Sequence, residues 1–146
     1  MQSRSEMAIA KFMEGYNCAQ SVFYAFSDDL GIDRNTTLKV ASGFGAGMAR
    51  KEEVCGAVSG GIMAIGARYG RGEQDDRTAT ELTYTRTRQL MDQFVQKHGT
   101  FICRKLLGGI ELTTEEGQQL YKNNDLKNKV CVPCVLSVVE ILELIE

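Results

Sequence analysis

The sequence lacks several features that would point to familiar functions. It has one proline, one histidine and no long apolar run among its 146 residues. A single histidine gives no basis for a serine–histidine–aspartate arrangement, and no run approaches the roughly twenty apolar residues that span a bilayer. The N-terminal stretch MQSRSEMAIAKFMEGYN has no apolar segment of the kind found in signal peptides. We therefore expect a cytoplasmic protein without a membrane span.

The net charge is also small, because the sequence has 17 Lys and Arg residues and 19 Asp and Glu residues. The sequence has no basic tract and no aromatic residues interleaved with Arg or Lys, so we expect no nucleic-acid partner. A hydrophobic fraction of 43% and a charged fraction of 25% are typical of a soluble globular protein. The length suits one domain, and we expect residues 1–146 to form it.

Apolar residues recur at helical spacing along most of the chain. Residues 54–67 are apolar almost all round, which predicts a buried central helix rich in glycine. Residues 75–97 contain many threonines, which favour strand, yet their leucines and phenylalanine keep helical spacing and predict a long helix. The sequence therefore predicts an all-α fold, a single-domain helical bundle of about five to seven helices.

Capping residues indicate where several helices begin. Asn17 is a good N-cap, and Asn35-Thr36-Thr37 is a candidate cap for the helix that follows it. Thr100 is a candidate cap for residues 101–107. Thr113-x-x-Glu116 has the pattern of a capping box for a helix near Glu115–Lys122. Pro133 suits the first position of the last helix.

Five cysteines are the candidate functional residues: Cys18, Cys55, Cys103, Cys131 and Cys134. Cytoplasmic thiols normally stay reduced, so this number favours metal or redox chemistry over structural disulfides. Each cysteine falls in or beside the first turn of a predicted helix. Free N–H groups and partial positive charge at that end favour the thiolate. The alternative is that the cysteines are buried as small hydrophobic residues.

Cys131 and Cys134 form a Cys-Val-Pro-Cys motif, which is the local form of a thioredoxin-type redox pair. No βαβ pattern surrounds it, and a chain with one proline cannot also contain the cis-proline loop of that fold. A zinc knuckle usually needs a second Cys-x-x-Cys pair, and the sequence has none. The motif alone leaves redox, metal and packing roles open.

The glycines favour packing over phosphate binding. The stretch GFGAG lacks the last glycine of the dinucleotide fingerprint and follows no strand pattern. Gly56, Gly60 and Gly61 are expected to let another helix approach the central one closely. His98 is expected to end the long helix, where a cation is favourable, and the alternative is a role as proton donor or ligand.

Five blocks of sequence, in order, resemble a known family: NCAQSV, SGFGAGM, VCGAVSG, ICRKLLG, and a late cysteine before a final helix. They are similar to the family of redox-active proteins named for its cysteine pattern, C_GCAxxG_C_C. One block departs from that name, since it has Cys-Gly-Ala-x-x-Gly at Cys55. The resemblance implies a helical protein of about this length with four family cysteines, at Cys18, Cys55, Cys103 and Cys131. Cys134 is then an addition, either a resolving thiol for Cys131 or a silent one.

The leading hypothesis is a thiol/disulfide redox protein, a candidate thiol–disulfide oxidoreductase, in which one cysteine attacks as thiolate and a second resolves the disulfide. The pairs Cys131–Cys134 and Cys18–Cys55 are the first to consider. One alternative is a metal or iron–sulfur site made of four thiolates. Another is a non-catalytic helical module whose apolar stripe from Val135 to Ile145 and glycine-rich helix pack across a homodimer. The sequence points to no particular substrate, cofactor or redox partner, and without a Cys-x-x-Cys-His motif we expect no haem.

Overall fold

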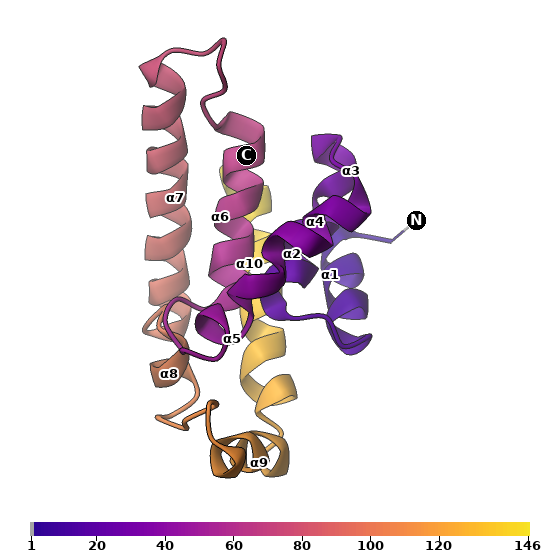
Figure 1. Cartoon of the computed structure of the whole chain (residues 1–146). Helices are drawn as coiled ribbons and strands as arrows, with labels where there is room; N and C mark the ends of the chain where they lie inside the picture. The colour runs from indigo at the N-terminus through magenta and orange to yellow at the C-terminus, as the bar shows by residue number, and fades with distance from the viewer. Residues whose placement is uncertain (1) are drawn as a thin grey trace.

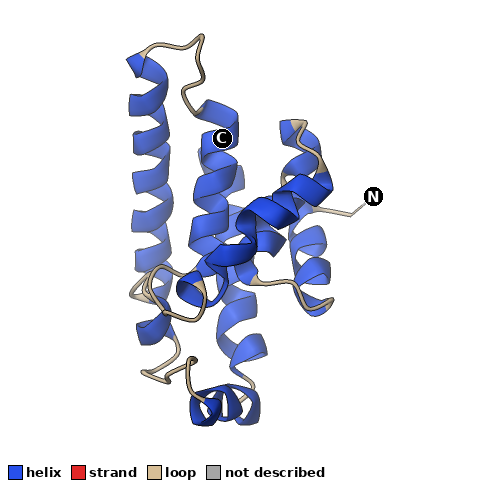
Figure 2. Ribbon diagram, viewed as in Figure 1, coloured by secondary structure: helices blue, strands red, loops and turns tan. Residues whose placement is uncertain are grey.

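The structure, a computed structural model, describes residues 2–146 and consists of helices joined by loops (Figures 1 and 2). Its helices are α1 (Arg4–Met13), α2 (Cys18–Ala25), α3 (Ser27–Leu30), α4 (Arg34–Ala41), α5 (Gly45–Met48), α6 (Gly56–Tyr69), α7 (Arg77–His98), α8 (Cys103–Leu106), α9 (Glu115–Asn123) and α10 (Val132–Ile145). Within the described residues, seven of them have eight or more residues, which agrees with the predicted bundle. The only β-type pairing there is one antiparallel bridge between Val54 and Ile102. None of these helices combines the length and apolar character needed to cross a membrane.

The glycine-rich helix α6 lies at the centre and packs against α2, α7 and α10 (Figure 1). A Cβ atom added to Gly60 would lie 2.5 Å from the carbonyl oxygen of Ala19 in α2. One added to Gly61 would lie 2.7 Å from Val138 of α10 and 2.9 Å from Leu90 of α7. The absent side chains therefore allow three helices to reach the α6 backbone, which confirms the packing prediction.

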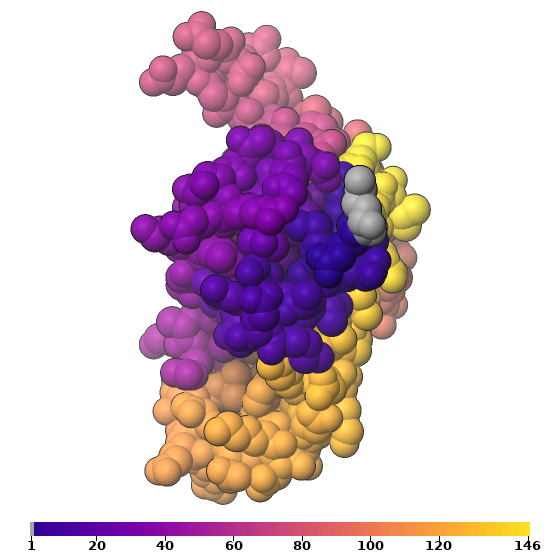
Figure 3. All heavy atoms as spheres, turned by 90° about the vertical axis from the view of Figure 1, so that its right-hand side faces the viewer, coloured from indigo at the N-terminus to yellow at the C-terminus, as the bar shows by residue number. Residues whose placement is uncertain are grey.

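The long helix predicted over residues 75–97 is also present, as α7. Its threonines fit a helix because the hydroxyls of Thr83 and Thr85 donate to the carbonyls of Ala79 and Glu81, at 2.8 and 2.9 Å. Leu90 and the phenylalanine four residues later are its only buried residues, so its C-terminal half joins the core. The other end projects with the end of α6 beyond the rest of the molecule (Figure 3).

Helix starts agree with the sequence prediction in one case and differ by one or two residues in two others. Asn17 caps α2 with a complete capping box. Asp33, and not residues 35–37, caps α4, and Thr114, and not Thr113, caps α9. Before both α4 and α9, several polar side chains that could act as caps are adjacent in sequence. The cap is the one whose oxygen reaches the N–H three residues on.

The last helix does not begin at Pro133 as predicted. Residues Lys127–Cys131 form a turn of π-helix that runs directly into α10. Cys131 has a helical backbone and Pro133 lies one residue inside α10. The expected free helix end is therefore absent at Cys131 and Cys134, because the preceding turn continues the helix.

A left-handed turn leads from α4 to α6. Residues 46–50 all have positive φ between 53° and 70°, and so does Glu52, although each such L-residue other than glycine costs roughly 1–2 kcal/mol. Gly47 is needed there, because an added Cβ would lie 2.5 Å from the Glu52 Cα. The chain then pairs with residues 101–103, where Cys55 N–H donates to Phe101 and Cys103 N–H donates to Glu53, each at 2.7 Å. The turn thus fixes where Cys55 and Cys103 lie.

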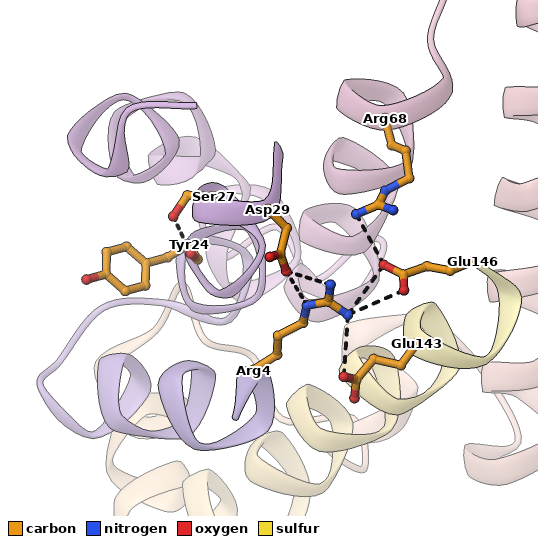
Figure 4. Close-up of polar contacts among 7 residues, drawn as sticks. All are labelled: Arg4, Tyr24, Ser27, Asp29, Arg68, Glu143 and Glu146. Carbon is orange, nitrogen blue, oxygen red and sulfur yellow. Dashed lines mark hydrogen bonds and ion pairs between the residues drawn. The ribbon is translucent and has the colours of Figure 1, made fainter. Parts of the chain in front are cut away.

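A charge network joins the first helix to the last (Figure 4). The guanidinium of Arg4 contacts Asp29 of α3 at 2.5 Å and reaches Glu143 and Glu146 at 3.4 Å. Arg68 of α6 contacts Glu146 at 3.2 Å. Four helices are therefore connected through a few side chains at this end of the bundle.

Candidate functional site

The five cysteines lie around the junction of two hydrophobic clusters, and all of them are free thiols. The larger cluster contains Cys55 and Cys134, with Cys18 packed against it. The smaller one contains Cys103, with Cys131 packed at its edge. Val130, next to Cys131, contacts both clusters. The structure therefore brings residues that are far apart in sequence to one region.

Cys18 is the first residue of α2, as the Asn17 cap predicted. Its Cβ would lie only 3.2 Å from a Cβ added to Gly56, so the start of α6 lies directly against it. A hydrogen bond with Cys131, followed by burial and the charges of the neighbouring thiols, raises the pKa of Cys18 well above its usual value. Cys18 therefore keeps its proton and donates it.

Cys131 is half-buried and carries the most favourable surroundings for a thiolate. The hydroxyl of Tyr121 donates to its sulfur at 3.3 Å. The hydrogen bond from Cys18 lowers the pKa of Cys131 most. The hydrogen bond from Tyr121 and the positive charge of Lys127 lower it further, so that it reaches about 7 although burial raises it. About half of this thiol is ionised at neutral pH. The sequence predicted a thiolate at Cys131 because a helix was expected to begin there. In the structure, neighbouring side chains lower the pKa of Cys131, and no free helix end does so.

Cys55 and Cys134 form a second, buried pair, with 6% and 1% of their surfaces exposed. They share a hydrogen bond, which is the largest cause of a lowered pKa at Cys55 and a raised pKa at Cys134. Cys55 is the N-cap of α6, and the N–H groups of Ala57 and Val58 also favour its thiolate. At Cys55, therefore, the predicted helix start does lower the pKa of the thiol.

The thiol interactions that shift the pKa values most join other partners than the two pairs considered first. The sequence suggested Cys131 with Cys134 and Cys18 with Cys55, and these stay predictions, whereas the largest pKa effects act between Cys18 and Cys131 and between Cys55 and Cys134. Cys131 and Cys134 are three residues apart on one continuous helix. Each meets a thiol from a different helix start, at α2 and α6 respectively, and this arrangement depends on tertiary packing.

Cys103 is buried in the smaller cluster as the first residue of α8. Thr100 does not cap this helix as predicted, because its hydroxyl accepts from the N–H of Ile102 at 3.1 Å. Burial and then the neighbouring thiols raise the pKa of Cys103 to about 12, although Arg104 opposes this. Cys103 is therefore a neutral thiol at physiological pH.

Sequence reasoning missed two residues of this region, Tyr121 and Glu52. Glu52 is 2% exposed, and its Oε1 accepts from the N–H of Leu112 at 2.9 Å, with Arg104 at 3.6 Å. Its Oε2 has no hydrogen-bond partner among residues 2–146. Within the run Arg-Lys-Glu-Glu it has the sequence context of a solvated charge, and nothing local marks it as buried.

His98 ends α7 as predicted but is not a favourable cation there. Its Nε2 lies 2.8 Å from the Ser137 hydroxyl of α10, and its ring stacks on Phe94 at 4.5 Å between centroids. Burial, and to a lesser extent Lys97, lowers the pKa of His98. Its neutral ring links α7 to α10.

The part of the chain that the structure describes contains no group of three or more His, Cys, Asp or Glu side chains arranged to hold a metal ion. The thiols instead meet in hydrogen-bonded pairs, in which one sulfur holds a proton and the other has a lowered pKa.

The fold and the site together define an all-helical protein with paired free cysteines between its packed helices. The model of a family described as "Putative redox-active protein (C_GCAxxG_C_C)" matches residues 16–145, and the chain belongs to this family. The match confirms the resemblance inferred from the five sequence blocks. Comparisons with curated proteins and with solved structures gave no match.

Proposed function

We propose that this protein exchanges thiols with disulfides, with Cys131 as the attacking residue and Cys18 as the resolving one. One observation carries the proposal. The half-buried Cys131 sulfur accepts from the Tyr121 hydroxyl at 3.3 Å, and hydrogen bonds from Cys18 and Tyr121 lower its pKa. Its pKa of about 7 suits attack near neutral pH, where a thiol is both ionised and strongly nucleophilic.

The reaction has two steps. The Cys131 thiolate attacks one sulfur of the substrate disulfide, the S–S bond breaks, and the other substrate sulfur leaves as a thiolate. Cys18 then loses its proton and attacks the Cys131 sulfur, which releases the second substrate thiolate. The leaving thiolates take up the Cys18 proton and one proton from solvent. Two electrons pass to the substrate, and the protein is left with a Cys18–Cys131 disulfide.

The surroundings of Cys131 support both steps. Tyr121 and Lys127 lower its pKa, so they stabilise the thiolate that attacks and also the thiolate that returns when the disulfide is reduced. Lys127 is held near this site, with its ammonium 5.1 Å from the centre of the Phe12 ring. The hydrogen bond with Cys18 is also the largest cause of the lowered pKa of Cys131, so the two thiols act on each other directly.

The test is an anaerobic reaction of the reduced protein with oxidised glutathione, followed by intact mass. We expect the wild type to form a glutathione adduct briefly and then to lose two hydrogens. Cys131→Ser should form no adduct, and Cys18→Ser should accumulate it at Cys131. Cys103→Ser is the matched control, since its thiol is neutral and buried, and should behave as the wild type.

Two results would contradict the proposal: a Cys131→Ser variant that reacts at the wild-type rate, or an adduct that forms first on another cysteine. For the alternative of a metal or iron–sulfur site, residues 2–146 contain no group of three or more His, Cys, Asp or Glu side chains arranged to hold a metal ion. The dimer module loses its sequence argument, because Val135, Val138 and Leu142 of the apolar stripe are buried within this chain. A homodimer stays a prediction.

A further inference from the structure

The proposed exchange at Cys131 and Cys18 leaves a second pair of thiols unused. Cys55 and Cys134 share a hydrogen bond like the first pair, but they lie inside the larger hydrophobic cluster. With 6% and 1% of their surfaces exposed, neither sulfur is open to a substrate disulfide in this conformation. Any redox chemistry there needs another route for electrons.

Cys18 provides a contact between the two pairs. The start of α6 lies against it, since a Cβ on Gly56 would come within 3.2 Å of the Cys18 Cβ and 3.3 Å of the Ala19 nitrogen. Cys55 immediately precedes this glycine. Cys18 also packs against the larger hydrophobic cluster, which contains both Cys55 and Cys134. Cys134 and Cys131 are also three residues apart on one helix.

We propose that Cys55 and Cys134 form a second redox centre, oxidised only through Cys18, so that the protein holds four electrons in two dithiols. The proposal rests on the function assigned to Cys131 and Cys18 and extends it to the buried pair. The substrate class is the same, a disulfide. The Cys18–Cys55 pair considered from the sequence then has a role as an intermediate between the two stable pairs.

The internal transfer balances without any further reactant. The Cys55 thiolate attacks the Cys18 sulfur of the Cys18–Cys131 disulfide, and Cys131 leaves as a thiolate. Cys134 then loses its proton and attacks the Cys55 sulfur of the new Cys18–Cys55 disulfide. Cys18 leaves and takes up that proton. The result is a Cys55–Cys134 disulfide and a reduced Cys18 and Cys131, ready for a second substrate.

The direction of transfer follows from where charge lies. Cys131 is a good leaving group because Tyr121 and Lys127 stabilise its thiolate. In the buried pair, the Cys55 thiol has a lowered pKa, so it is the sulfur that attacks. The internal transfer therefore ends with negative charge on Cys131, which is half-buried, and not on the buried Cys55 or Cys134.

The experiment is a graded anaerobic titration with oxidised glutathione, read by intact mass and by mapping of disulfide-linked peptides. We expect the wild type to lose two hydrogens and then two more. Cys134→Ala should stop after two and show a Cys18–Cys55 disulfide beside Cys18–Cys131. Cys131→Ser should keep Cys55 and Cys134 reduced while folded. Cys103→Ala is the matched control and should lose all four.

The outcomes separate this inference from the proposed function. A wild type that loses two hydrogens, with Cys55 and Cys134 still reduced, overturns the second centre alone. Oxidation of that pair at the wild-type rate in Cys131→Ser overturns the route through Cys18. No loss of hydrogens at all overturns both proposals. Circular dichroism checks the fold, and Cys55→Ala, which should also stop after two hydrogens, replaces Cys134→Ala if that variant does not fold.

Discussion

Among single residues, Tyr121 acts most directly on the proposed nucleophile. Its hydroxyl donates to the Cys131 sulfur at 3.3 Å. Burial, and then the charge and hydrogen bond of Cys131, raise the pKa of the Tyr121 phenol, so it remains a donor across the pH range in which the thiol titrates. Hydrogen bonds to charged groups contribute about 1.5–3 kcal/mol, enough to shift a thiol pKa by roughly one unit or more.

We predict that Tyr121→Phe raises the pKa of Cys131 from about 7 by roughly one unit. Only the thiolate reacts, so labelling of Cys131 by iodoacetamide should fall as pH drops below that pKa. In the variant this fall should begin at higher pH. The measurement is the labelling rate of Cys131 between pH 5 and 10, by peptide mass. Tyr84→Phe, at an exposed tyrosine, is the control. An unchanged midpoint in Tyr121→Phe would make Tyr121 a packing residue.

The sequence could predict those residues whose surroundings are local. Asn17 places Cys18 at a helix start through its own capping box, and Cys55 precedes a helix with a clear apolar pattern. Tyr121 and Glu52 could not be found this way, because their partners come from distant segments brought together by folding. The pairing of the thiols was missed for the same reason.

At the scale of elements, α6 contains glycines in two different environments, one packed against a neighbouring helix and one with open space around it. Gly60 faces α2, where an added Cβ would meet the backbone oxygen of Ala19 at 2.5 Å. Gly66 has no neighbouring atom within 4 Å of such a Cβ. The two positions therefore separate the effect of helix packing from that of helix propensity.

We predict that Gly60→Ala destabilises the protein by about 1–3 kcal/mol, because α2 must move away. Gly66→Ala should stabilise it by about 0.5–1 kcal/mol, because alanine loses less conformational entropy in a helix. Both free energies of unfolding are measured by chemical denaturation. A Gly60→Ala variant at least as stable as the wild type would show that the contact between α2 and α6 is looser than described.

The start of α10 shows a limit of sequence reasoning about elements. Pro133 lacks an N–H and commonly opens a helix, so a helix start there is the ordinary interpretation. A π-turn has an enlarged ring of hydrogen bonds, and here it continues the helix through residues 127–131 into α10. No local signal in the sequence distinguishes this continuation from a new helix.

At the scale of the whole molecule, Arg4 links the N-terminal helix to the last helix, because its ion-pair partners lie on α3 and α10 (Figure 4). Its guanidinium also lies 4.8 Å from the centre of the Phe26 ring. The Arg34–Asp28 pair offers a comparison, since it is equally short at 2.6 Å but more than half exposed on both sides. Exposed ion pairs contribute little because solvent screens them.

We predict that Arg4→Ala lowers the free energy of unfolding by about 1–2 kcal/mol, and that Arg34→Ala lowers it much less, because solvent screens its pair with Asp28. Part of the Arg4 effect should disappear at 1 M salt, where charges are screened within roughly 3 Å. Thermal and chemical denaturation at low and high salt measure both. Equal losses in the two variants would mean that the network adds nothing beyond a single surface pair.

The left-handed turn at residues 46–50 has a consequence for the chirality of the chain. D-Amino acids prefer the positive φ values that L-residues avoid, and Ala49 is exposed with φ of 53°. Its D-alanine counterpart at this one position should stabilise the protein by about 1 kcal/mol. Cys55, six residues later, is a natural junction for joining a synthetic N-terminal peptide to the remaining chain. In this short segment the handedness of natural amino acids opposes the fold that they form.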